Sequence, residues 1–181
     1  QPTSTTAATV ISPAVHVRVK NAAGETDLTA TTFVALAVTS GTGTSGAALG
    51  GVLAVAAVNG VATFSDLAVN LVGTGYTLTA TAGGVAPATS TAFSVLAGSP
   101  HHLEISNPSG AVAGAVIAPA VAVRIVDAGG NLVTTSTATV TIALDCNPSG
   151  GQLLGTAAVA ASGGVATFAD LSINRTESQY T

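Results

Sequence analysis

The residues best suited to bind a metal ion lie in the second half of the chain. Asp127 and Asn131 are four residues apart, and Asp145 comes directly after a predicted strand. Carboxylate and amide oxygens are the ligands that Ca²⁺ prefers in proteins, so these three residues could form a loop-bound calcium site. The alternative is that Asp127 opens and caps a turn, a place that Asp often takes. The sequence suggests no other metal and no organic cofactor.

The remaining titratable residues form no catalytic set. His101 and His102 are adjacent, and we expect them to point to opposite faces of a strand, where they cannot bind one metal ion. Asp66 and Asp170 each stand apart from other acids, so neither belongs to an acid/base pair, and we expect both to cap turns. No nucleophile motif or phosphate-binding loop is present. The sequence therefore predicts a protein that is not an enzyme.

The aromatic residues also argue against a sugar-stacking platform, which needs exposed rings. Aromatic residues make up 3% of the chain, and all fall at strand positions that we expect to be buried. They are Phe33, Phe64, Tyr76, Phe93, Phe168 and Tyr180.

Composition limits the partners and the compartment. Only 7% of the 181 residues are charged, against about 25% in an average domain. Cores of Ala and Val with Thr-rich and Ser-rich surfaces suit a secreted or cell-surface protein. The net charge is −4 with only four cations, which excludes a phosphate-binding stripe and hence nucleic acid. The longest apolar run, residues 111–126, is interrupted by Gly114, Pro119 and Arg124, so we expect no membrane span.

Two features concern the processing of the chain and its capacity to form disulfides. It begins at Gln1 with neither an initiator Met nor a signal-peptide pattern, which indicates a processed product or an internal fragment. Cys146 is the single cysteine, so no disulfide can form within the chain.

An octapeptide repeat organises the sequence. Residues 60–67 read Gly-Val-Ala-Thr-Phe-Ser-Asp-Leu, and residues 164–171 read Gly-Val-Ala-Thr-Phe-Ala-Asp-Leu, 104 residues later (164 − 60). This period is the size of one β-sandwich domain. We therefore predict two domains, residues 1–98 and 99–181, with Phe64 and Phe168 as their largest core residues.

Alternating hydrophobicity predicts strands at matching places in both domains. Apolar residues occupy every second position from Val15 to Val19, and the same pattern recurs 106 residues later (121 − 15). We expect each of these strands to form a hairpin with the next one, residues 31–38 or 137–144. We expect a second, tight hairpin at the Asn59-Gly60 turn and a tyrosine corner at Tyr76 and Tyr180.

The two domains are cut differently at the outer ends of the chain. Residues 101–106 form a predicted strand without a counterpart in the first domain, and the second domain stops before the counterparts of residues 78–95. Each domain is thus expected to lack a strand or strands at its outer end. Continuing chain or a neighbouring subunit could supply them by strand complementation.

Three repeated patterns carry a resemblance to a known family. They are Val-x-Val-x-(Val/Ile)-x-(Asn/Asp)-Ala-x-Gly, the octapeptide, and Gly-Thr-Gly-Tyr-Thr-Leu-Thr-Ala at residues 73–80. Together they resemble the bacterial immunoglobulin-like repeats of long secreted and cell-surface proteins, of the invasin and intimin type. Residues 175–179 depart from the pattern of the first copy.

The resemblance implies an all-β chain of two tandem immunoglobulin-like Greek-key β-sandwich domains. It implies a structural role in a surface fibre, filament or stalk, with partners that are neighbouring repeats or other copies. The alternative is an adhesin arm that binds a surface glycan or protein through the loops at residues 40–46 or 146–150. A third interpretation is an accessory domain of a secreted enzyme.

Overall fold

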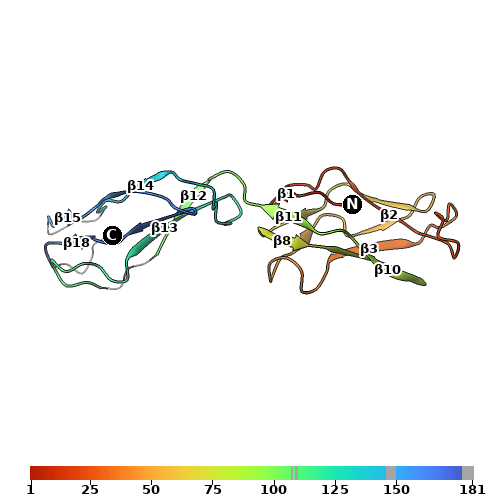
Figure 1. Cartoon of the computed structure of the whole chain (residues 1–181), viewed down its shortest axis with the longest axis horizontal. Coiled ribbons are helices and arrows are strands. Elements are labelled where there is room, and N and C mark those ends of the chain that lie inside the picture. The colour runs from red at the N-terminus through yellow and green to blue at the C-terminus, as the bar shows by residue number, and fades with distance from the viewer. Residues whose placement is uncertain (107, 109, 146–149, 177–181) are drawn as a thin grey trace. The chain divides into compact units, whose positions relative to one another are not determined.

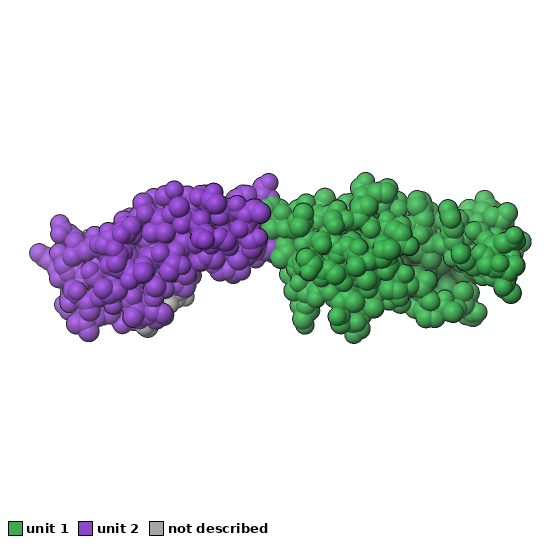
Figure 2. All heavy atoms as spheres, in the orientation of Figure 1, with its two compact units in different colours: residues 1–98 green, residues 99–181 purple. Residues whose placement is uncertain are grey.

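The structure is a computed structural model that describes residues 1–106, 108, 110–145 and 150–176. Throughout these residues the secondary structure is β-strand and turn, with no helix, so the all-β prediction is confirmed. The chain divides into two compact units, Gln1–Gly98 and Ser99–Thr181 (Figure 2). Among the described residues, none form a helix of the length and hydropathy that crossing a membrane requires.

Unit 1 contains eleven strands (Figure 1). One sheet has the order β10-β9-β3-β5 and another has the order β1-β11-β8, and two strand pairs, β2-β6 and β4-β7, complete the unit. The strands are β1 (Thr5–Thr6), β2 (Val15–Arg18), β3 (Phe33–Val38), β4 (Leu49–Gly50), β5 (Ala54–Ala56), β6 (Val61–Phe64), β7 (Ala68–Val69), β8 (Gly73–Tyr76), β9 (Leu78–Ala82), β10 (Val85–Thr89) and β11 (Phe93–Leu96).

The described part of unit 2 contains seven strands. A three-stranded sheet has the order β12-β13-β17, and the pairs β14-β16 and β15-β18 accompany it. The strands are β12 (His102–Ile105), β13 (Val121–Val126), β14 (Thr139–Thr141), β15 (Leu153–Leu154), β16 (Ala158–Ala160), β17 (Val165–Phe168) and β18 (Ser172–Ile173).

The predicted hairpin between the first two long strands of each unit is wrong. β2 pairs with β6, whereas β3 pairs with β5 and β9 in another sheet. After β2 the chain makes a short turn, in which Lys20 and Thr26 form an isolated antiparallel bridge instead of a continuous hairpin. It then crosses to the other sheet, because a core between two layers needs apolar strand faces from both of them. In unit 2, β13 likewise pairs with β17 and not with β14.

The tight turn at Asn59-Gly60 is confirmed, but its flanking strands also separate into different sheets. Val58 and Val61 exchange two backbone hydrogen bonds of 3.0 Å each. The φ angles of Asn59 and Gly60 are 49° and 75°, as a type I′ turn requires. Beyond this turn, β5 pairs with β3 and β6 pairs with β2, so the turn joins two layers. Ser162 and Val165 close the equivalent turn in unit 2.

Each unit has its own core, consistent with a β-sandwich. Phe64 is 1% exposed and belongs to one core cluster with Val34, Leu36 and Leu78, which lie on strands of another sheet. Phe168 occupies the same place in unit 2 and is also 1% exposed. The prediction that the octapeptide phenylalanines are core residues is confirmed.

Candidate functional site

The two principal calcium candidates hold their own turn together. Asp127 and Asn131 are both buried. The Asp127 Oδ1 atom accepts hydrogen bonds from the backbone amides of Gly129 and Asn131, each at 2.9 Å. The Asn131 side-chain amide donates to the same carboxylate at 3.2 and 3.3 Å. Asp127 therefore caps the turn that it opens.

Asn21 forms the equivalent turn in unit 1 without a charge. Its Oδ1 atom accepts from the backbone amides of Ala23 and Glu25, each at 3.0 Å. Because a neutral amide does in unit 1 what a carboxylate does in unit 2, the turn needs an oxygen acceptor and not a negative charge. This comparison favours the turn-capping alternative. The third candidate, Asp145, is exposed. Over the described part of the chain, no three His, Cys, Asp or Glu side chains cluster as ligands of a metal ion would.

Asp66 and Asp170 cap a distant turn and not their own. The Asp66 carboxylate accepts from the backbone amide of Val52 at 3.0 Å, 14 residues upstream. The Asp170 carboxylate accepts from the amide and the hydroxyl of Thr156, at 2.9 and 2.8 Å. These two hydrogen bonds, the amide bond first, hold the pKa of Asp170 below its usual value. A Cβ at Gly155 would lie 2.4 Å from the Asp170 carbonyl oxygen, so this close contact requires glycine.

Tyr76 forms the predicted tyrosine corner. Its hydroxyl donates to the Leu71 carbonyl oxygen at 2.9 Å, and its ring is fully buried. The loop at residues 40–46 lies against this ring, because a Cβ at Gly43 would come within 2.1 Å of it. The Thr44 hydroxyl fixes the loop further by donating to the Val72 carbonyl at 2.6 Å. Tyr180 lies outside the described residues.

The two adjacent histidines are closer together than expected. Their Nδ1 atoms are 3.3 Å apart, and their rings make an edge-to-face contact with centroids 5.5 Å apart. The expectation of opposite faces is wrong because His101 precedes β12, so the alternation of a strand does not apply to it. Phe33 is a second correction: it was expected to be buried but is 69% exposed at the start of β3, where Val34 and Leu36 face the core.

Two features of the sequence fall outside the described residues. The first is Cys146, the single cysteine. The second is most of the candidate binding loop at residues 146–150, because residues 146–149 are not described.

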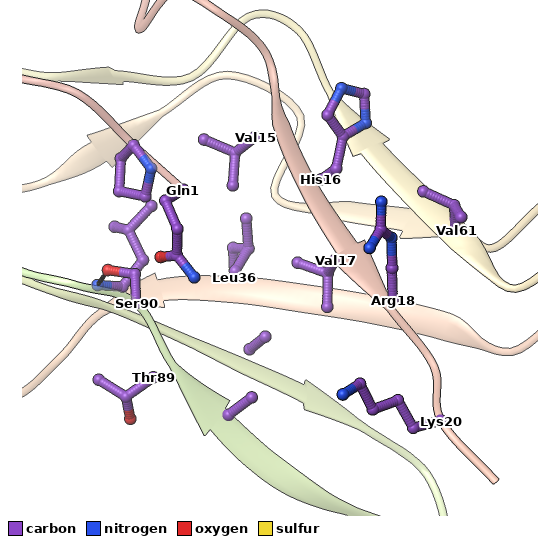
Figure 3. A pocket seen from close by; sticks show the side chains of 14 residues that line it. Gln1, Val15, His16, Val17, Arg18, Lys20, Leu36, Val61, Thr89 and Ser90 are labelled. Carbon is purple, nitrogen blue, oxygen red and sulfur yellow. Dashed lines mark hydrogen bonds between the residues drawn. The ribbon is translucent and has the colours of Figure 1, made fainter. Parts of the chain in front are cut away.

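Unit 1 contains a groove that sequence reasoning did not identify (Figure 3). Its volume is about 500 Å³. The buried side chains of Leu36, Leu78 and Ala80 contribute apolar surface to it. β2 supplies one wall with Arg18, and the end of β10 supplies another with Thr89. The groove is thus a trough with both polar and apolar lining, between strands from different sheets.

The groove lies beside the edge of β2 that has no neighbouring strand in the described structure. β2 pairs only with β6, whereas its counterpart β13 pairs with both β17 and β12. The sequence carried a signal for this difference, because residues 101–106 have no counterpart in the first repeat. That signal could not show that an accessible groove results.

Comparisons with protein-family models, with curated proteins and with solved structures found no match to this chain.

Proposed function

We propose that this chain is a non-enzymatic extracellular structural protein, part of a surface fibre, filament or stalk, whose repeat units resist extension. The observation that carries the proposal is the pairing of the first and last strands of unit 1. β1 and β11 run parallel, with Thr5 opposite Val95 and Thr6 opposite Leu96. The Ala7 amide adds a hydrogen bond of 2.8 Å to the Leu96 carbonyl.

Parallel pairing of terminal strands determines how a stretching force acts. A force applied through the chain pulls β1 toward its N-terminal end and β11 toward its C-terminal end. Since the strands are parallel, these pulls are opposite along one axis. The force then shears all the hydrogen bonds between β1 and β11 together, instead of opening them one at a time. A side-chain bond from the Ser94 amide to the Ser4 hydroxyl, 3.2 Å long, strengthens the same pairing.

Hydrogen bonds of polar side chains that recur in both units give further support to the structural role. Asn21 and Asp127 cap equivalent turns, and Asp66 and Asp170 make equivalent contacts, so the polar chemistry that recurs between the units maintains the fold. The proposal includes an immunoglobulin-like Greek-key sandwich for each unit, as the resemblance to bacterial surface repeats implies, and an extracellular location, as the low charge content suggests.

Single-molecule force spectroscopy on the full chain, held at its two ends, tests this function. We expect two separate unfolding events, because the units have separate cores. Unit 1 has 98 residues and unit 2 has 83 (181 − 98), which correspond to extended lengths of about 320–350 Å and 270–300 Å. The longer step therefore identifies unit 1.

The substitution Ala7→Pro removes the amide hydrogen that bonds to Leu96. We expect it to lower the unfolding force of the longer step and to leave the shorter step unchanged, so unit 2 serves as the internal control. Extension without discrete events, or a longer step that is indifferent to Ala7→Pro, would contradict the proposed mechanical role.

A further inference from the structure

The two adjacent histidines of unit 2 are held side by side by one residue of the neighbouring strand. The His101 amide donates to the Val126 carbonyl oxygen at 2.8 Å, and His102 lies opposite the same Val126 in the pairing of β12 with β13. Val126 is fully buried. The backbone of both histidines is therefore fixed to a buried part of unit 2, while both side chains are exposed.

The spacing of the ring nitrogens matches the ligand spacing of a tetrahedral zinc ion. The two Nδ1 atoms are 3.3 Å apart. Two nitrogens that each lie about 2.0–2.1 Å from one Zn²⁺ ion, at the tetrahedral angle, are about 3.3–3.4 Å apart. At the right angle of a square-planar or octahedral ion, nitrogens at the same bond length would be only about 2.8–3.0 Å apart. The observed distance is therefore that of two ligands of a tetrahedral ion.

A hydrogen bond between the two rings has the same spacing and is compatible with a metal site. In that bond one Nδ1 atom carries a proton and the other accepts it, so a proton lies between the nitrogens. A zinc ion can take the place of this proton. The ring that carried the proton on Nδ1 then carries one on Nε2, by exchange with water, and both neutral rings direct an Nδ1 lone pair to the ion. The number of protons on the two rings does not change.

The two histidines are the whole set of protein ligands that the described residues offer at this place. No third His, Cys, Asp or Glu side chain among those residues joins the pair in a metal-binding cluster. Glu104, two residues further along β12, forms an ion pair with Arg124. Two protein ligands leave two positions of the tetrahedron, which water can occupy. The net charge of −4 favours the approach of a cation.

We propose that His101 and His102 bind one Zn²⁺ ion through their Nδ1 atoms, with water in the remaining two positions. Strand alternation does not exclude the pair, because His101 precedes β12. The fold makes the site, since the contacts to Val126 hold the backbone of both ligands in place before the ion binds. The site goes beyond the structural role proposed above and does not depend on it.

Isothermal titration calorimetry of the full chain with zinc chloride tests the proposal first. We expect one ion per chain. His101→Ala and His102→Ala should each weaken binding by at least about tenfold, because loss of even an outer-shell partner of a metal ligand costs about 10–100-fold in affinity. Since both side chains are exposed, neither substitution removes a core contact.

His16→Ala is the matched control, because it removes the third histidine of the chain. The His16 Nδ1 atom lies 3.0 Å from the Thr63 hydroxyl in unit 1, and we expect zinc binding to be unchanged. A chain that does not bind zinc, or binding that His101→Ala or His102→Ala leaves unchanged, overturns the proposal.

NMR of the isotopically labelled imidazole nitrogens identifies the ligating atoms. Zinc should shift the Nδ1 resonances of both rings and leave both Nε2 atoms protonated. A shift at Nε2 instead, or at one ring only, overturns the two-nitrogen geometry.

A peptide with the sequence of residues 99–106 separates the contribution of the fold from that of the two side chains. It contains both histidines but lacks the backbone contacts to Val126. We expect the peptide to bind zinc about fivefold more weakly than the full chain, or weaker still, because it must order both side chains on binding. In calorimetric unfolding of the full chain, zinc should raise the Tm of unit 2 and not that of unit 1, since a ligand that prefers the folded state stabilises it. Equal affinity of the peptide and the full chain, or an unchanged Tm of unit 2 in saturating zinc, overturns the assignment of the site to the fold.

Discussion

Two adjacent glycines in the turn at residues 162–165 offer a sharp test of how this fold is held. Gly163 and Gly164 have similar positive φ angles, 60° and 79°. A Cβ at Gly163 would meet no atom within 4 Å, whereas a Cβ at Gly164 would lie 2.5 Å from the Val133 carbonyl oxygen. Backbone conformation alone therefore predicts similar effects of substitution, and the close contact predicts different ones.

We expect Gly163→Ala to cost about 1–2 kcal/mol, for the left-handed backbone alone. Unit 1 already has Asn59 at this position, with a φ of 49°. Gly164→Ala should cost about 3 kcal/mol: about 1–2 for the left-handed backbone and a similar amount for displacing the Val133 carbonyl. For a unit of 83 residues (181 − 98), this corresponds to a fall in Tm of about 12–24 °C.

Differential scanning calorimetry of the full chain measures both variants, with the transition of unit 1 as the internal reference. The corresponding pair in unit 1, Asn59→Ala and Gly60→Ala, should show the same contrast, because a Cβ at Gly60 would lie 2.2 Å from the Asp27 carbonyl oxygen. Equal destabilisation by Gly163→Ala and Gly164→Ala would refute the reasoning, since the close contact would then have no energetic weight.

Three further predictions concern single side chains. Tyr76→Phe removes the hydrogen bond to the Leu71 carbonyl and should destabilise unit 1 by about 0.5–1.5 kcal/mol in urea unfolding, with no change in the m-value. Thr156→Val removes a hydroxyl and should raise the pKa of Asp170 toward its usual value, as NMR titration of the carboxyl carbon would show; an unchanged pKa would contradict the assignment of the hydrogen bond. Hydrogen bonds from the Thr29 hydroxyl and amide likewise lower the pKa of Asp27. The stability that the Asp27 and Asp170 carboxylates contribute should therefore be present above about pH 4 and should be lost as the pH falls through their lowered pKa values. The Tm difference between the wild type and Asp27→Asn with Asp170→Asn should accordingly shrink from pH 7 to pH 2.

Local patterns in the sequence predicted local structure well. Alternating hydrophobicity correctly predicted the inner and outer faces of the strand that begins at Val15. The octapeptide predicted that Phe64 is a core residue, and Asn59-Gly60 predicted a tight turn. Alternation specifies which face of a strand is buried but not which strand lies beside it. The hairpin from β2 to β3 was wrong for this reason, because the apolar pattern of β2 is satisfied equally well by β6.

The candidate sites were less predictable, because they depend on residues distant in sequence. The partner of Asp66 is 14 residues away, and no local motif connects the two. The groove depends on β2, β9 and β10 together, so it exists only once the sheets are placed. The contact between His101 and His102 escaped prediction because the start of β12 falls between them, and strand boundaries are the least certain feature of a sequence.

The pairing of β2 with β6 also has a consequence for how the chain folds. β17 has the same sequence as β6, Val-Ala-Thr-Phe, so β2 could pair with either strand. Val15 is 49 residues from Phe64 (64 − 15) and 153 residues from Phe168 (168 − 15). The entropy of loop closure grows only logarithmically with length and favours the correct partner by about 1 kcal/mol. A newly made chain would avoid this choice for as long as the second repeat has not been synthesised, so the order of synthesis would protect the first unit from pairing with the wrong strand.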